Sequence, residues 1–205
     1  MTCLLATNNP AKVQEIKAMF EAEGLSVICL SDLSLSLTPD ETGATFEENA
    51  GIKAAETAAF LRENGHGNIV VLADDSGLQI DALDGRPGVD SALFMGRETP
   101  YAVKNRRILD MMAGVPEEKR TARFVCVLVC VGLTPEPIIV EGRIEGRIAY
   151  SASGTDGFGY DPIFFYPAYN KTLAELTPEE KNLVSHRGQA LQKMMGVITN
   201  ANISN

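Results

Sequence analysis

Two adjacent carboxylates, Asp74 and Asp75, directly follow the apolar run at residues 69–73. A strand holds carboxylates rigidly while a following loop leaves room for water and substrate, an arrangement that suits a hard cation such as Mg²⁺. Side chains alternate along a strand, so we expect one aspartate to face a ligand and the other to face helix caps or backbone. Taken alone, the pair fits a turn or capping role at least as well.

A second candidate site is the segment Thr7-Asn8-Asn9-Pro10-Ala11-Lys12, which links an expected strand to an expected helix. We expect free backbone N–H groups and the helix dipole to favour a phosphate there, with Lys12 adding a point charge. The segment lacks the GxxxxGK[ST] pattern of a Walker A loop. A plain turn with a helix cap is the alternative.

Glu41 lies in a turn-rich stretch, and Lys53 lies on the helix expected to follow it, on one face with Asn49 and Glu56. Separately, Glu41 and Lys53 are ordinary surface residues. The alternative is that Glu41 joins Asp75 around Mg²⁺ and that Lys53 neutralises phosphate oxygens. Such charge stabilisation suits phosphoryl chemistry.

The loop at residues 154–162 contains three glycines, two aromatic residues and two aspartates. Such a loop is costly to order, which indicates a ligand. Its Phe158 is suited to stacking on a base. A turn that covers a sheet edge is the alternative.

Three polar side chains near the C-terminus, Lys181, His186 and Arg187, raise a geometric question. On a straight helix of about 100° per residue, His186 lies roughly 140° and Arg187 roughly 240° round from Lys181. The three side chains converge only if the helix is interrupted.

Ser185 is suited to begin a new helix as its N-cap. We therefore predict one helix from 178 to about 184 and a second from about 186 to 195. This break would let the three polar groups face one pocket.

The elements expected to position these residues alternate between strand and helix, which predicts an α/β fold. Apolar runs and turn residues place strands at 3–6, 25–30, 69–73, 78–82, 123–131 and 138–150. Caps, prolines and helical spacing place further helices at 10–24, 45–61 and 99–114. The length of 205 residues fits one domain, and we expect it to have two lobes that share a sheet.

The longest strongly apolar stretch, at 124–131, is far shorter than the roughly 20 residues needed to cross a bilayer. The first residues show no export signal. Cys3, Cys29, Cys126 and Cys130 lie in apolar, strand-like surroundings, which favours buried reduced thiols. We expect a cytoplasmic protein with no membrane partner.

The formal net charge of −9 argues against a nucleic-acid polymer as partner, because such surfaces need basic stripes. A small anion is compatible with this charge. A few lysines, a helix N-terminus and a metal ion make a locally positive pocket within an acidic protein.

Six segments in order closely resemble the Ham1/RdgB family of inosine/xanthosine triphosphate pyrophosphatases. They are LLATNNPAKVQEI, ETGATFEENAGIKA, VLADDSGLQIDAL, PGVDSA, GTDGFGYDPIF and KTLAELTPEEKNLVSHRGQAL. The resemblance implies an elongated, two-lobed α/β fold with a long central mixed sheet flanked by helices and a cleft between the lobes. It also implies a homodimer and Mg²⁺-dependent hydrolysis of ITP, dITP and XTP to the monophosphate and pyrophosphate.

The resemblance further implies roles for individual residues. It makes Glu41 and Asp75 the metal ligands, Asp75 the proton acceptor for the attacking water, and Lys53 a group that faces the phosphates. The substrate-binding residues that it implies are Thr7, Asn8, Asn9, Pro10, Ala11, Lys12, Ser76, Phe158, Gly159, Tyr160, Asp161, Lys181, His186 and Arg187, with the base stacked on the aromatic ring.

Two positions depart from the family pattern. Asn8-Asn9-Pro10 stands where a glycine-containing turn is frequent, and Asp156 stands where glycine is frequent. Neither departure removes a proposed catalytic group, but Asp156 adds a negative charge near the substrate loop.

Two other functions remain as alternatives. One is a Maf-like pyrophosphatase that acts on pyrimidine or modified nucleotides, and the other is a non-catalytic nucleotide-binding module. A haloacid-dehalogenase phosphatase is disfavoured, because Asp74-Asp75-Ser76-Gly77 lacks its DxDx[TV] spacing.

Overall fold

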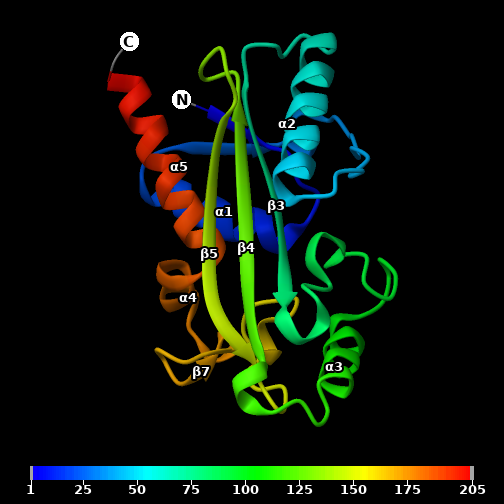
Figure 1. The fold of residues 1–205 in the computed structure, drawn as a ribbon. Helices are drawn as coiled ribbons and strands as arrows, with labels where there is room; N and C mark the ends of the chain where they lie inside the picture. Colours follow the sequence, from blue (N-terminus) through cyan, green and yellow to red (C-terminus); the bar gives the residue numbers. More distant parts are fainter. Residues whose placement is uncertain (1, 204–205) are drawn as a thin grey trace. The chain divides into compact units, whose positions relative to one another are not determined.

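The structure, a computed structural model, describes residues 2–203 of the chain (Figure 1). Its strands are β1 (Thr2–Leu5), β2 (Ser26–Cys29), β3 (Val70–Ile80), β4 (Thr121–Val131), β5 (Ile138–Ile148), β6 (Phe164–Tyr166) and β7 (Lys171–Thr172). Its α-helices are α1 (Pro10–Ala22), α2 (Phe46–Glu63), α3 (Tyr101–Met111), α4 (Pro178–Val184) and α5 (His186–Ile203). The predicted α/β fold is confirmed.

Within the described residues, seven strands form one sheet in the order β2-β1-β3-β4-β5-β6-β7. β1 pairs in parallel with β2 and β3, whereas β6 pairs antiparallel with β5 and β7. The sheet is therefore mixed, as predicted. β6 and β7 were not predicted, because strands of three and two residues are too short to show alternation.

Two helices begin at the capping boxes that the sequence indicates. At α2, Thr45 Oγ1 accepts from the Glu48 backbone N–H at 3.1 Å, and the Glu48 carboxylate accepts from the Thr45 backbone N–H at 3.1 Å. At α4, Thr177 and Glu180 repeat this exchange. Each exchange satisfies two backbone donors that a helix start otherwise leaves unbonded.

The predicted break between α4 and α5 is confirmed. Ser185 is extended, with φ −68° and ψ 156°, and a new helix begins at His186. The prediction that this second helix ends near residue 195 was wrong. It continues to Ile203 because its apolar stripe, including Met194 and Ile198, stays fully buried.

Packing divides the chain into two compact units, each with its own core. Unit 1 comprises the residues up to Asp75, Cys126–Gly142 and the residues from Arg187 onward. Its core includes Phe20 of α1, Leu191 of α5 and Leu72 of β3.

Unit 2 comprises Ser76–Val125 and Arg143–His186. Its core places Ile108 of α3 with Leu78, Phe124 and Phe164 from the strands. β3, β4 and β5 therefore contribute residues to both cores.

β3 differs from its prediction in one respect that matters for the site. We expected a strand at 69–73 that ends at Asp74-Asp75 and a separate strand at 78–82, but one strand runs from Val70 to Ile80. Leu78 and Ile80 are fully buried in the core of unit 2, so the chain stays extended through the acidic pair. Asp74 and Asp75 thus lie within a strand.

No helix in the described part of the chain is long and apolar enough to span a membrane.

Candidate active site

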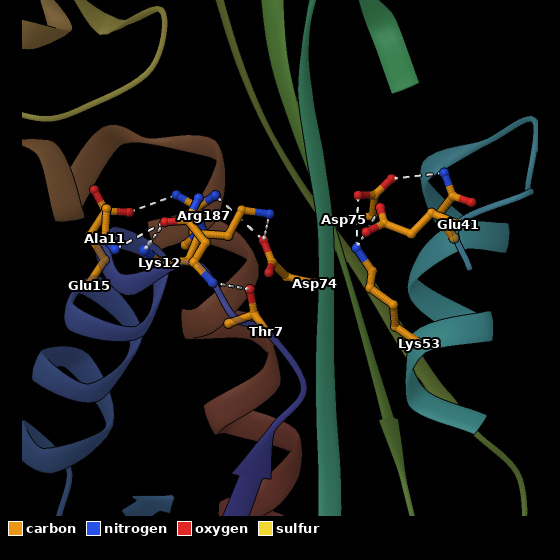
Figure 2. A network of polar contacts seen from close by, with 11 residues as sticks. Thr7, Ala11, Lys12, Glu15, Glu41, Lys53, Asp74, Asp75 and Arg187 are labelled. Atoms are coloured by element: carbon orange, nitrogen blue, oxygen red, sulfur yellow. Dashed lines mark hydrogen bonds and ion pairs between the residues drawn. The ribbon is translucent and has the colours of Figure 1, made fainter. Parts of the chain in front are cut away.

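Asp74 and Asp75 project from opposite sides of β3, as strand alternation predicts. Figure 2 shows Asp74 on the side of α1 and α5, and Asp75 on the side of α2. Both are buried, with 0% and 5% of their surfaces exposed. Asp74 meets two cations, which corrects the expectation that the second aspartate faces helix caps or backbone.

On the α2 side, Asp75 and Glu41 share one cation. Lys53 Nζ lies 3.0 Å from Asp75 Oδ1 and 3.2 Å from Glu41 Oε2. Lys53 is buried on α2, while the Glu41 side chain is 36% exposed in the turn that precedes the helix. The structure therefore brings together the three residues that the sequence singled out for metal and phosphate binding.

Burial and neighbouring charges shift the pKa values of Asp75 and Lys53. Burial raises the pKa of Asp75, and the positive charges of Lys53 and Lys12 only partly oppose that effect. Burial also disfavours the charged form of Lys53, but the nearby carboxylates outweigh it, and the pKa of Lys53 is raised. Lys53 thus stays a cation beside an aspartate that accepts a proton more readily than an ordinary one.

Asn49 belongs to the same group, although the sequence did not identify it as a site residue. Its Nδ2 donates to Asp75 Oδ2 at 3.4 Å, and its Oδ1 accepts from the Gly43 backbone N–H at 2.8 Å. The available signal was its position four residues before Lys53, on the same face of the helix.

On the other side of β3, Asp74 meets Lys12 and Arg187. Lys12 Nζ lies 2.9 Å and Arg187 Nη2 lies 3.5 Å from Asp74 Oδ2. Burial alone opposes ionisation of Asp74, but these two charges outweigh it and hold its pKa well below the ordinary range. Arg187 also pairs with Glu15 at 2.7 Å, and sequence reasoning missed Glu15.

The turn before α1 is more fully bonded than we expected. Asn9 Oδ1 accepts from the backbone N–H groups of Ala11 and Lys12 at 3.0 and 3.4 Å, so Asn9 caps the helix. Asn9 N–H in turn donates to Thr7 Oγ1 at 3.3 Å. We expected free backbone N–H groups in this turn, but those of Asn9, Ala11 and Lys12 donate to side chains of the turn itself.

Two other residues of this turn have structural positions. Asn8 is exposed and its side chain donates to the Leu37 carbonyl at 3.1 Å. Pro10 occupies the first position of α1, as its fixed φ predicts.

In unit 2, Asp161 organises the loop that carries Phe158. Its Oδ2 accepts from the Phe158 backbone N–H at 2.8 Å and from Lys181 Nζ at 2.7 Å. The Lys181 ammonium lies 4.7 Å from the centre of the Phe158 ring, so it occupies one face of that ring. A Cβ at Gly157 would overlap the Asp161 carboxylate, which explains the glycine.

The same loop is fixed by α3 and its neighbours. Asn105 Nδ2 donates to the Gly159 carbonyl at 3.0 Å, and Tyr160 OH donates to the Ser91 carbonyl at 2.7 Å. The Tyr160 ring packs edge-on against Tyr101. Contacts with α3 and with Ser91 therefore hold the loop in place.

The remaining predicted residues take separate positions. His186 is buried and stacks on Phe124 with the ring centres 4.7 Å apart, and Ser76 is half-buried in β3 directly after Asp75. Lys181, His186 and Arg187 thus contact different groups. Convergence of the three on one ligand stays a prediction.

The donor set on the α2 side fits a magnesium ion. Mg²⁺ is commonly held by one or two carboxylates together with substrate phosphates. Glu41 and Asp75 supply two such carboxylates, and both lie within ion-pair distance of the Lys53 ammonium. Among residues 2–203, no group of three or more histidine, cysteine or acidic side chains forms a preassembled metal cage. This is compatible with an ion whose coordination a triphosphate completes.

Comparison with known proteins gives full-length matches. The family model described as the Ham1 family matches residues 3–197. The "dITP/XTP pyrophosphatase" of Exiguobacterium sibiricum is 47% identical over 199 residues, which is 97% of this chain and 98% of that protein. The protein of the same name from Bacillus subtilis is 44% identical over 191 residues, 93% of each chain.

A solved structure agrees with these matches. The Staphylococcus aureus Ham1 protein superposes with a TM-score of 0.84 at 36% identity, covering 98% of this chain and 99% of that one. Sequence and fold point to the same relatives over nearly the whole length, and the chain belongs to the Ham1 family.

Proposed function

We propose that this protein hydrolyses ITP, dITP and XTP to the nucleoside monophosphate and pyrophosphate. Relatives that match nearly the full chain are named dITP/XTP pyrophosphatase. The observation that carries the proposal is the convergence of Asp75 and Glu41 on Lys53. Two oxygen ligands beside a fixed positive charge suit phosphoryl transfer, in which positioning and charge stabilisation supply most of the catalysis.

The proposed reaction is attack of a water molecule on the α-phosphorus. The new bond joins the water oxygen to that phosphorus, and the bond from phosphorus to the oxygen bridging to the β-phosphate breaks. Asp75 accepts the water proton. In the protein without a bound ion, burial raises the pKa of this carboxylate above that of an exposed aspartate.

Positive groups of unit 1 balance the charge of the leaving pyrophosphate in this proposal. Lys53 and Lys12 are the cations nearest the two aspartates, and Lys12 stands at the start of α1, where the helix dipole also favours an anion. Glu41 and Asp75 would hold Mg²⁺. Such an ion, when bound, polarises phosphate oxygens.

We assign base and sugar recognition to the loop at 158–161 together with Lys181, His186 and Arg187. Lys181 covers one face of Phe158, so the base would stack on the other face. A site that donates to a 6-oxo group, and has no acceptor for a 6-amino group, rejects adenine because a buried polar group would be left unpaired.

The test is product analysis with a panel of nucleotides. We expect ITP, dITP and XTP with Mg²⁺ to give one monophosphate and one pyrophosphate per turnover, with ATP hydrolysed at least about a hundredfold less efficiently. Chelation by EDTA should abolish turnover. Release of inorganic phosphate with a nucleoside diphosphate would contradict the proposed bond cleavage.

The same panel distinguishes the alternatives. Faster turnover of UTP or dTTP than of ITP would favour a Maf-like specificity. Calorimetric binding of ITP without any pyrophosphate release would indicate a non-catalytic binding module.

A homodimer and a cytoplasmic location are part of the same proposal. All four cysteines are free and buried, which suits a reducing compartment. Light scattering should give twice the chain mass, and a monomer at micromolar concentration would contradict the dimer.

A further inference from the structure

Asn49 links two parts of the candidate active site that are distant in the sequence. Its side chain is buried, with 3% of the residue exposed. Because Oδ1 accepts from the Gly43 N–H at 2.8 Å, the Nδ2 donors must face the other way, and one of them reaches Asp75 Oδ2 at 3.4 Å. The carboxamide thus accepts a hydrogen bond from the Gly43 backbone with its oxygen and donates one to the Asp75 carboxylate with its nitrogen.

Gly43 shows how closely the preceding turn lies on α2. A Cβ at this position would stand 2.6 Å from Glu48 Cβ and 2.8 Å from Asn49 Oδ1. The neighbouring Ala44 N–H also donates to Glu48 Oε2 at 2.6 Å. The turn that carries Glu41, two residues before Gly43, is therefore held against the first turn of the helix.

The contacts of Asp75 use both of its carboxylate oxygens. Oδ1 accepts from Lys53 at 3.0 Å, and Oδ2 accepts from Asn49. Two donors on two oxygens define the rotation of the carboxylate plane, which one donor alone would leave free. Asn49 and Lys53 are spaced by one helical turn, so α2 presents both donors together.

We propose that Asn49 is a positioning residue for hydrolysis, which orients the Asp75 carboxylate and holds the Glu41 turn beside it. This inference rests on the proposed function, because it concerns the same reaction. The described contacts of Asn49 join Gly43 and Asp75. Neither of these two residues is assigned to recognition of the nucleobase. Loss of Asn49 should therefore lower kcat more than it raises KM.

The test compares Asn49→Ala and Asn49→Asp with wild type in steady-state release of pyrophosphate from ITP. Removing a group that orients a catalytic ligand typically costs about ten- to a hundredfold in activity. We expect kcat to fall by about tenfold or more in both variants, with KM for ITP within about threefold of wild type. The aspartate variant keeps the acceptor for Gly43 but loses the donor to Asp75.

Thr57→Ala is the matched control. Thr57 is buried on the same helix, 1% exposed, and its hydroxyl has no hydrogen-bond partner among the described residues. Urea unfolding measures the stability of both variants, and Thr57→Ala should keep kcat within about twofold of wild type. A kcat loss in Thr57→Ala equal to that in Asn49→Ala would overturn the inference, because general loosening of α2 would explain both.

Other outcomes are also decisive. If Asn49→Ala does not fold, Asn49→Asp and Gly43→Ala are judged by the same kcat criterion, since a Cβ at Gly43 would displace Asn49 Oδ1. An active wild type with kcat in the Asn49 variants within about twofold overturns this inference alone. A wild type that releases no pyrophosphate overturns the proposed function, and the inference with it.

Discussion

Asp74 and Asp75 are neighbours in the chain but have opposite electrostatic surroundings. Asp74 is held ionised by Lys12 and Arg187, which keep its pKa below the ordinary range despite complete burial. Asp75 has its pKa raised by burial, with Lys53 only partly compensating. A carboxylate that stays charged near neutral pH suits a structural role, and one that is more basic in the metal-free protein suits proton transfer.

At this scale we predict that Asp74→Asn destabilises the fold more than Asp75→Asn does. The substitution leaves Lys12 beside a neutral amide and leaves Arg187 paired with Glu15, and breaking one side of a buried ion pair costs about 3 to 5 kcal/mol. Lys53 keeps Glu41 as a partner when Asp75 is changed. Urea unfolding at neutral pH measures the free energy of unfolding of both variants. Equal losses of stability would contradict a structural role for Asp74 and a catalytic role for Asp75.

The lowered pKa of Asp74 also predicts a pH dependence of stability. The unfolded chain binds a proton at this aspartate near pH 4, whereas the folded chain does so only at lower pH. Acidification therefore favours the unfolded state, and the contribution of Asp74 is present above about pH 4 and is lost below it. The free-energy gap between wild type and Asp74→Asn should narrow from pH 6 to pH 3. A constant gap would contradict the assignment.

At the scale of elements, the close approach of β6 to β5 depends on one glycine. A Cβ on Gly146 would lie 2.5 Å from the Phe165 carbonyl oxygen and 2.7 Å from the Phe164 ring. Phe164 is fully buried in the core of unit 2, so its ring has little room to move away. The short strand β6 packs here because β5 has no side chain at this position.

We therefore predict that Gly146→Ala lowers the free energy of unfolding by about 1 to 3 kcal/mol, the usual cost of overpacking. Gly51→Ala is the control, because a Cβ at Gly51 on α2 meets nothing within 4 Å. Alanine favours the helix over glycine by about 1 kcal/mol, so the control should gain stability. Thermal unfolding of both variants checks the pair, and a neutral Gly146→Ala would show that β6 shifts freely.

At this scale much was predictable from local sequence. Thr45 with Glu48 marked the start of α2, and Ser185, a residue type suited to an N-cap, marked the break between α4 and α5. Asparagine is a strong N-cap residue, so the sequence could have identified Asn9 as the cap whose side chain accepts from the Ala11 and Lys12 backbone N–H groups. The pairing of Arg187 with Glu15 spans 172 positions, and no local pattern encodes it.

At the scale of the whole molecule, the two cores explain what the sequence could not reveal. β3 looked like two strands because its middle, Asp74 to Gly77, is polar or small. Its apolar ends are buried in different cores, Leu72 in unit 1 and Leu78 in unit 2. Continuity of the strand is a tertiary property, and Asp74 and Asp75 are the last residues of the strand that belong to unit 1.

Relatives match this chain over nearly its full length, and so the match includes every separate segment that contributes to the candidate site. The turn at Glu41, the helix at Lys53 and the strand at Asp75 are brought together only by the fold of unit 1. The central claim is that this group carries out hydrolysis through Asp75.

Steady-state kcat for pyrophosphate release from ITP in Mg²⁺, compared between wild type and Asp75→Asn, tests that claim most directly. We predict a fall in kcat of far more than tenfold, with the variant still folded by circular dichroism and unfolding cooperatively in urea. A folded variant that keeps more than about a tenth of the wild-type kcat, a loss below about 1.4 kcal/mol in transition-state stabilisation, would contradict it.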